Sequence, residues 1–220
     1  MPRSARRSLL CGAVATLSAC AAQQPGPRPA VAPPPQLLAR VYDCEGTQTI
    51  VEWVSHEEIQ LRLPSREVRL PRVRSASGTK YAVGGTVFWS KGPIAMLELP
   101  DQGATPCEED RPRSLREDAR LRGVHYRGLG SEPGFSIEIG PDDIAFEYDY
   151  GAKKLVFPLQ SPQLRGKGRR TYDHATSSHH LRVAIEDGVC LDSMTGDAFD
   201  TTVEVTLDGR TFRGCGDALR

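Results

Sequence analysis

The sequence predicts an all-β protein with two β domains, and three observations support this fold class. Apolar and polar residues alternate in short runs, as Ile59, Leu61 and Leu63 do with Gln60 and Arg62. This period of two is typical of strands with one buried face. Near the end of the chain, an Asp-Gly pair interrupts the run VEVTLDGRTFRGC and predicts a tight hairpin. After the first 20 residues no segment has the apolar periodicity of a helix, so no helix is expected there.

The first 20 residues have the layout of a bacterial lipoprotein signal peptide. Three arginines precede an apolar run from Leu9 to Leu17, which is too short to remain as a membrane-spanning helix. The ending Leu-Ser-Ala-Cys resembles the bacterial lipobox, in which the cysteine, here Cys20, receives lipid and becomes the first residue. An ordinary signal peptide that contains a cysteine is the alternative. Ala21 and Ala22 follow the cysteine, with no aspartate, which in lipoproteins of this kind implies the outer rather than the inner membrane. We therefore expect a lipid-anchored protein on the outer membrane that faces the periplasm.

Residues 21–38 are rich in proline, alanine and glutamine and are expected to form an extended tether. Removal of the leader leaves 25 basic and 28 acidic residues, a net charge of −3. Such a chain has no excess of positive charge to attract a nucleic acid, so no nucleic-acid partner is expected. No later apolar stretch is long enough to cross a membrane.

Four further cysteines lie in the expected mature chain: Cys44, Cys107, Cys190 and Cys215. An even number in an exported protein favours disulfides, and three connectivities are possible. Pairing of nearest neighbours, Cys44 with Cys107 and Cys190 with Cys215, gives each half one disulfide. Zinc is the alternative, but the chain has no Cys-x-x-Cys pair and the compartment is oxidising, so we expect no metal and no cofactor.

The charged segment 108–120, EEDRPRSLREDAR, contains a proline and shows no apolar face. It is the expected domain boundary, with residues 109–120 as a linker between a first domain at 39–108 and a second domain at 121–220. In the first domain, strands are expected at TIVEWV, around Val68 and Leu70, at TVFW and at IAMLEL. Strands of this length and spacing suggest a small antiparallel barrel or a sandwich.

The second domain also has the alternation of strands. One predicted strand face carries Ile144, Phe146, Tyr148 and Tyr150, and another carries Leu181, Val183 and Ile185. The Asp208-Gly209 hairpin is the strongest local signal in this half.

Two glycine loops in the first domain carry a serine and a lysine. Ser77 precedes one glycine and Lys91 precedes another, and on residue statistics alone both belong to solvated turns. A catalytic role is the alternative, because SGTK at 77–80 formally matches the Ser-x-x-Lys motif of penicillin-recognising enzymes. However, positions three apart on a strand face opposite sides, and the companion Ser-Asp-Asn and Lys-Thr-Gly motifs are absent. We therefore expect no enzyme.

Residues 42–107 resemble the MliC family, the membrane-bound inhibitors of c-type lysozyme. The resemblance is carried by Tyr42, Cys44 and Gly46, by SASGTKY at 75–81, by FWSKG at 88–92 and by Cys107. It implies a closed antiparallel barrel of eight strands, with c-type lysozyme as the partner. It also implies that Ser77 and Lys91 are the inhibitory residues. Lys80, a second basic residue beside the serine, departs from the family pattern, and is either an additional contact or a solvated side chain.

The chemistry of the partner is consistent with these two residues. C-type lysozyme uses two carboxyl groups in a cleft, one protonated and one ionised. A hydroxyl can bond to either group, and an ammonium pairs with the ionised one. We expect Tyr81, Phe88 and Trp89, in or beside the joining strand, to belong to the core. The alternative function is a periplasmic envelope module of the same fold without inhibitory activity.

Residues 121–219 resemble a domain of uncharacterised bacterial envelope lipoproteins, on the segments GLGSEPGFSIEI, CLDSM and FRGCG. This resemblance brings no known chemistry. His174, His179 and His180, with Asp173, raise the possibility of a metal site. The surrounding segment is polar, and adjacent histidines on a strand face opposite sides, so we expect no metal there.

Overall fold

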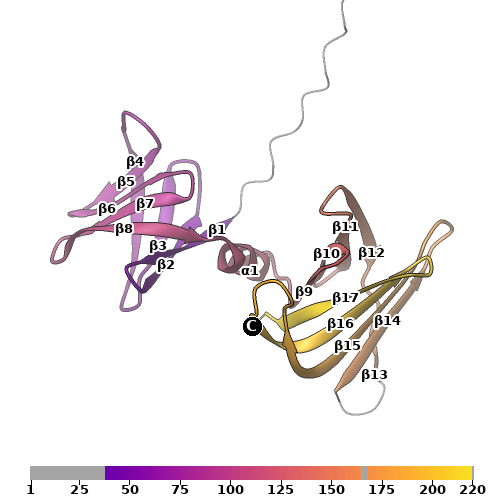
Figure 1. Cartoon of the computed structure of the whole chain (residues 1–220). Coiled ribbons are helices and arrows are strands. Elements are labelled where there is room, and N and C mark those ends of the chain that lie inside the picture. The colour runs from indigo at the N-terminus through magenta and orange to yellow at the C-terminus, as the bar shows by residue number, and fades with distance from the viewer. Residues whose placement is uncertain (1–37, 165–167, 220) are drawn as a thin grey trace, which may run out of the picture. The chain divides into compact units, whose positions relative to one another are not determined.

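The structure is a computed structural model that describes residues 38–164 and 168–219, which are mostly strands (Figure 1). The expected signal peptide, the lipidation site Cys20 and almost all of the tether lie outside the described residues. The predicted all-β fold class is confirmed.

The first eight strands form a closed antiparallel barrel. They are β1 (Ala39–Cys44), β2 (Thr47–Trp53), β3 (Glu58–Arg62), β4 (Glu67–Val73), β5 (Thr79–Val83), β6 (Thr86–Lys91), β7 (Ile94–Leu99) and β8 (Gly103–Asp110). Each strand pairs with the next in the chain, and β1 pairs with β8 to close the barrel, with Tyr42 opposite Glu109. The predicted eight-stranded barrel is therefore confirmed.

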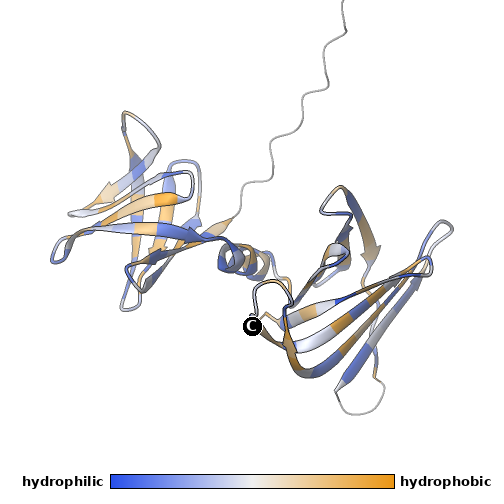
Figure 2. Ribbon diagram, viewed as in Figure 1, coloured by the Kyte–Doolittle hydropathy of each residue, from blue (hydrophilic) through white to orange (hydrophobic). Residues whose placement is uncertain are grey.

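The barrel core follows the alternation of the sequence. In β3, Ile59 and Leu61 are fully buried, whereas their neighbours Gln60 and Arg62 are partly exposed. Hydrophobic and hydrophilic residues alternate along the barrel strands in Figure 2. The buried cluster consists of Tyr42, Cys44, Val51, Ile59, Leu61, Leu70, Tyr81, Phe88, Ala95, Leu97 and Cys107. The expected disulfide between Cys44 and Cys107 is formed and joins β1 to β8. It therefore crosslinks the strand pair that closes the barrel.

The remaining strands form one nine-stranded sheet in the order β12-β11-β10-β9-β17-β16-β15-β14-β13. They are β9 (Tyr126–Ser131), β10 (Gly134–Ile139), β11 (Asp143–Tyr148), β12 (Lys153–Pro158), β13 (Gln163–Leu164), β14 (Arg169–Ala175), β15 (His180–Leu191), β16 (Ala198–Leu207) and β17 (Arg210–Ala218). The rings of Phe157 in β12 and His174 in β14 are 6.2 Å apart, although six strands separate β12 from β14 in the sheet. The sheet therefore curls around its own core, as Figure 1 shows.

This core is separate from that of the barrel and includes the predicted residues Ile144, Phe146, Leu181, Val183 and Ile185. Tyr148 packs against it, but the expectation for Tyr150 is wrong. This residue lies in the turn after β11, where its backbone has a positive φ of 56° and its side chain is 83% exposed.

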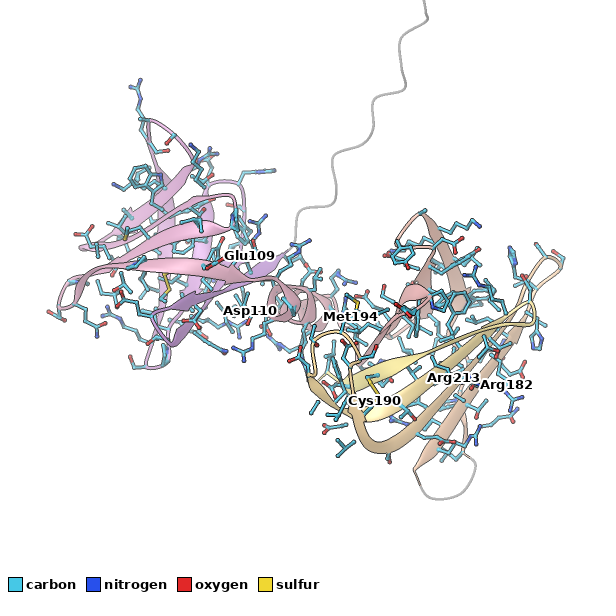
Figure 3. The ribbon with its side chains drawn as sticks, viewed as in Figure 1. Glu109, Asp110, Arg182, Cys190, Met194 and Arg213 are labelled. Atoms are coloured by element: carbon cyan, nitrogen blue, oxygen red, sulfur yellow. A yellow bond between two sulfur atoms is a disulfide. The ribbon has the colours of Figure 1, made fainter. Side chains whose placement is uncertain are left out.

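The predicted hairpin at Asp208-Gly209 is present. It joins β16 to β17, with Leu207 opposite Arg210. Both turn residues have positive φ angles, which is what a two-residue hairpin turn of this kind requires. The second expected disulfide, between Cys190 and Cys215, joins β15 to β17 (Figure 3).

The expectation of no helix is wrong for the charged segment, because α1 (Arg111–Leu121) replaces most of the expected linker. Asp110, labelled in Figure 3, caps its N-terminus by accepting a hydrogen bond from the backbone N–H of Arg113 at 3.0 Å. The helix lacks an apolar stripe because two of its buried side chains are polar. The Ser114 hydroxyl accepts from the N–H of Val41 at 2.9 Å, and Asp118 accepts from the N–H of Leu38 at 2.7 Å.

These hydrogen bonds attach α1 to β1 and to the residue before it. Because most of the buried side chains of the helix are polar, hydrophobic periodicity could not reveal it. Over the described ranges, α1 is the only helix, and its 11 residues are too few and too polar to span a lipid bilayer.

Candidate functional site

The serine loop connects β4 to β5, and Ser77 is exposed in it. Two hydrogen bonds fix the backbone of this loop. The Ser75 hydroxyl donates to the carbonyl O of Gly78 at 3.0 Å, and the indole Nε1–H of Trp89 donates to the carbonyl O of Ser77 at 2.8 Å. The hydroxyl of Ser77 is therefore presented on a backbone that is held from two sides.

Gly78 brings this loop against the neighbouring strand β6. It has a positive φ of 65°, and a Cβ atom built on it would lie 2.3 Å from the carbonyl O of Ser90 and 3.2 Å from Cβ of Lys91. Only glycine allows this close approach together with this backbone conformation. The serine loop and the lysine are therefore direct neighbours at one end of the barrel.

Lys91 is the last residue of β6 rather than a loop residue, and its side chain is exposed. It lies opposite Ile94 across a two-residue turn, Gly92-Pro93. Gly92 has a positive φ of 63°, as the first central position of a type II′ turn requires. The lysine is thus presented by a strand of the rigid barrel and by a short turn.

The pairing of β5 with β6 explains why the two residues meet. Gly84-Gly85 forms the turn between these strands, with Val83 opposite Thr86 and Thr79 opposite Ser90. Continuation of this register by one residue places Gly78 beside Lys91. A Gly-Gly pair between two apolar runs is a recognised hairpin signal, so the proximity could have been derived from the sequence.

The expectation that Trp89 belongs to the core is wrong. Tyr81 and Phe88 are buried, at 2% and 0% exposure, but Trp89 is 41% exposed. Successive residues of a strand face opposite sides, so Trp89 must point outward if Phe88 points inward. Its ring instead lies beside Lys80, whose Nζ is 5.5 Å from the ring centroid.

Beneath the serine loop and Lys91, the barrel wall is closely packed. The ring of Phe88 meets that of Tyr42 in an edge-to-face contact, with 5.2 Å between centroids. Burial raises the pKa of the Tyr42 hydroxyl, which therefore stays neutral. This ring contact joins β6, which carries Lys91, to β1, which carries Cys44 of the barrel disulfide.

The histidine group of the second sheet divides into separate pairs. Nδ1 of His179 lies 2.7 Å from Oδ2 of Asp208, and Nε2 of His180 lies 2.7 Å from Oδ1 of Asp173. His174 is buried in the core, at 2% exposure. Within the described residues, no group of three or more His, Cys, Asp or Glu side chains is arranged to hold a metal ion.

A closed barrel that presents a hydroxyl and an ammonium on adjacent elements has the form of a rigid binding domain. Comparison with known proteins agrees with the resemblance predicted from the sequence. Residues 42–106 match the family model described as membrane-bound lysozyme-inhibitor of c-type lysozyme, abbreviated MliC. The resemblance expected for residues 42–107 is confirmed over this range.

One curated relative is the membrane-bound lysozyme inhibitor of C-type lysozyme from Yersinia enterocolitica. The two sequences are 37% identical over 62 residues, which cover 28% of this chain and 53% of the relative. The chain therefore spans about half the length of this relative.

Proposed function

We propose that the barrel inhibits c-type lysozyme by inserting Ser77 and Lys91 into the active-site cleft of the enzyme. The family match over the barrel supports this function. The observation that carries the two-residue mechanism is the contact between Gly78 and Lys91, because it makes one binding surface of two elements that are separate in the sequence.

The chemistry of the two side chains suits a cleft with one protonated and one ionised carboxyl group. The exposed hydroxyl of Ser77 can donate to or accept from either group, and the ammonium of Lys91 pairs with the charged one. In a closed cleft, each charge-assisted hydrogen bond contributes roughly 1.5–3 kcal/mol. The rigid barrel keeps the ordering cost of binding low. In this proposal the protein itself is not an enzyme, and Lys80 adds at most a minor contact.

The proposal also assigns the protein a location and each segment of the chain a role. Residues 1–20 are the lipoprotein signal, Cys20 carries the lipid, and residues 21–38 are the tether to the outer membrane on its periplasmic side. Residues 39–108 are the inhibitor domain. Residues 121–220 are an accessory domain of the envelope with a separate core, and α1 lies between them.

Cell fractionation tests the location. The Cys20→Ala variant should lose lipid and appear as an unprocessed or soluble form, while the wild type fractionates with the outer membrane. If the variant still carries lipid, the lipobox reading is wrong.

A lysozyme titration tests the function. The lipid-free mature protein should slow the lysis of cell walls by hen-type c-type lysozyme in a saturable manner, and a separately produced second domain should not. If the mature protein has no effect at any concentration, the barrel is an envelope module without inhibitory activity.

A further inference from the structure

Trp89 makes an unusual contact for a residue on the outer wall of a barrel. It lies on β6, two residues before Lys91, and its indole Nε1–H donates to the carbonyl O of Ser77 at 2.8 Å. This bond joins the strand that carries the lysine to the residue that carries the hydroxyl. It is a bond to the backbone, so it fixes the position of Ser77 without occupying the hydroxyl.

The serine loop depends on such contacts, because the two strands that it joins, β4 and β5, pair with each other only briefly. Between β4 and β5 the register holds at only two positions, Arg72 with Tyr81 and Val73 with Lys80. In contrast, β5 and β6 pair at five positions, from Thr79 to Val83. The loop is therefore held mainly from the side of β6, where Trp89 lies.

The indole ring is itself restrained. Lys80 lies opposite Trp89 in the register, and its Nζ is 5.5 Å from the ring centroid. A cation at this distance is attracted to the face of an indole ring. Lys80, on β5 just after the serine loop, thereby helps to orient the ring of the tryptophan.

From this geometry we propose that Trp89 is a positioning residue, which holds Ser77 at a fixed place relative to Lys91. This inference rests on the proposed function, because the effect of the positioning is to present the two side chains together to lysozyme. In this role Trp89 acts through its N–H group, and the ring alone does not suffice.

The test is Trp89→Phe, which keeps an aromatic ring beside Lys80 and removes the donor. The matched control is Trp53→Phe, because Trp53 lies at the end of β2 and its ring lies near Arg40, 5.6 Å from the guanidinium carbon. Trp89→Phe should weaken inhibition by about two- to tenfold, the equivalent of one neutral hydrogen bond. Trp53→Phe should leave it unchanged, and the melting temperatures of the two variants should be similar.

A double-mutant cycle separates positioning from direct contact. If Trp89 acts through Ser77, Trp89→Phe should have little further effect in a Ser77→Ala background and its full effect in a Lys91→Ala background. Equal and full effects in both backgrounds would overturn the proposal.

A second measurement does not need lysozyme. In the free protein, ¹⁵N relaxation should show lower order parameters for Ser77 and Gly78 in Trp89→Phe than in the wild type or Trp53→Phe. Unchanged order parameters would overturn the positioning role even if inhibition fell. A wild type that failed to inhibit lysozyme would overturn the proposed function, whereas the relaxation data would still decide whether Trp89 fixes the loop.

Discussion

Gly78 lies directly against Lys91: a Cβ atom added to the glycine would be 3.2 Å from Cβ of the lysine. The same atom would be 2.3 Å from the carbonyl O of Ser90, a separation too short for any unstrained contact. The loop that carries Ser77 therefore rests on the strand that carries Lys91. Any change that separates the loop from the strand should affect both residues together.

Gly78→Ala should displace the serine loop, because the new methyl group meets backbone and the φ of 65° is unfavourable for alanine. We expect a loss of about 1–3 kcal/mol in the free energy of unfolding and a marked loss of lysozyme inhibition. Denaturant unfolding and an inhibition assay measure the two effects. The control is Gly46→Ala, which also has a positive φ but has open space around the added atom. It should be destabilised by about 1–2 kcal/mol and should inhibit normally. Equal inhibition by the two variants would contradict the contact.

Lys91→Ala should weaken inhibition by roughly tenfold to a hundredfold at low ionic strength, because it removes a charge-assisted hydrogen bond. Salt screens part of this interaction, so the difference between the variant and the wild type should shrink as ionic strength rises. Lys80→Ala is the control, with a smaller expected loss because the Lys80 ammonium lies over the Trp89 ring. Inhibition constants across a salt series measure the effect. A loss for Lys80→Ala as large as that for Lys91→Ala would be evidence against the assignment.

Removal of the barrel disulfide, by the double change Cys44→Ala and Cys107→Ala, should strongly destabilise the barrel. The bridge spans 63 positions in the sequence and closes β1 onto β8, and by loop entropy it contributes about 4 kcal/mol. Cys190→Ala with Cys215→Ala removes a bridge over 25 positions, and should cost about 3.5 kcal/mol in the second sheet. Thermal unfolding of each variant measures the loss. If the first pair of changes left the barrel transition unmoved, the disulfide would not be a determinant of its stability.

The second sheet should lose stability in mild acid because of His174. This side chain is 2% exposed, packs near Phe157, and burial lowers its pKa below the ordinary value of 6.5. The unfolded chain therefore binds a proton at His174 more readily than the folded chain does. As the pH falls below about 6.5, the free energy of unfolding should decrease until the folded pKa is reached.

His174→Phe removes this titration and keeps a ring of similar shape, so its stability should change less between neutral pH and about pH 5. The control His56→Phe alters an exposed histidine of the barrel and should keep the wild-type pH dependence of the second sheet. Urea unfolding at several pH values decides the matter. Identical pH slopes for His174→Phe and the wild type would show that His174 is not responsible.

The alternation of apolar residues was enough to predict many of the strands and part of both cores, because these strands have one buried face. Ile59 and Leu61 in the barrel and Val183 and Ile185 in the second sheet are examples. The same rule, applied to Phe88, would also have placed Trp89 outside. By contrast, α1 could not be found from hydrophobic periodicity, since two of its three buried side chains, Ser114 and Asp118, are polar and only Ala119 is apolar.

The candidate site was only partly predictable. Ser77 and Lys91 were singled out by the family resemblance, whereas local sequence alone favoured two unrelated solvated turns. Their proximity depends on the register between β5 and β6, which the Gly84-Gly85 turn sets. The hydrogen bond from the Trp89 indole to the Ser77 carbonyl depends on how the Trp89 side chain is oriented over the neighbouring loop. The local sequence has no signal for this orientation.

The most direct test of the inhibitory mechanism is the lysozyme inhibition constant of the double variant Ser77→Ala, Lys91→Ala, measured together with its melting temperature. Both side chains are exposed, so the melting temperature should stay close to that of the wild type. The inhibition constant should rise by about a hundredfold or more, because two hydrogen-bonding groups are removed from the cleft. Wild-type potency in this variant would show that the two residues do not carry the function.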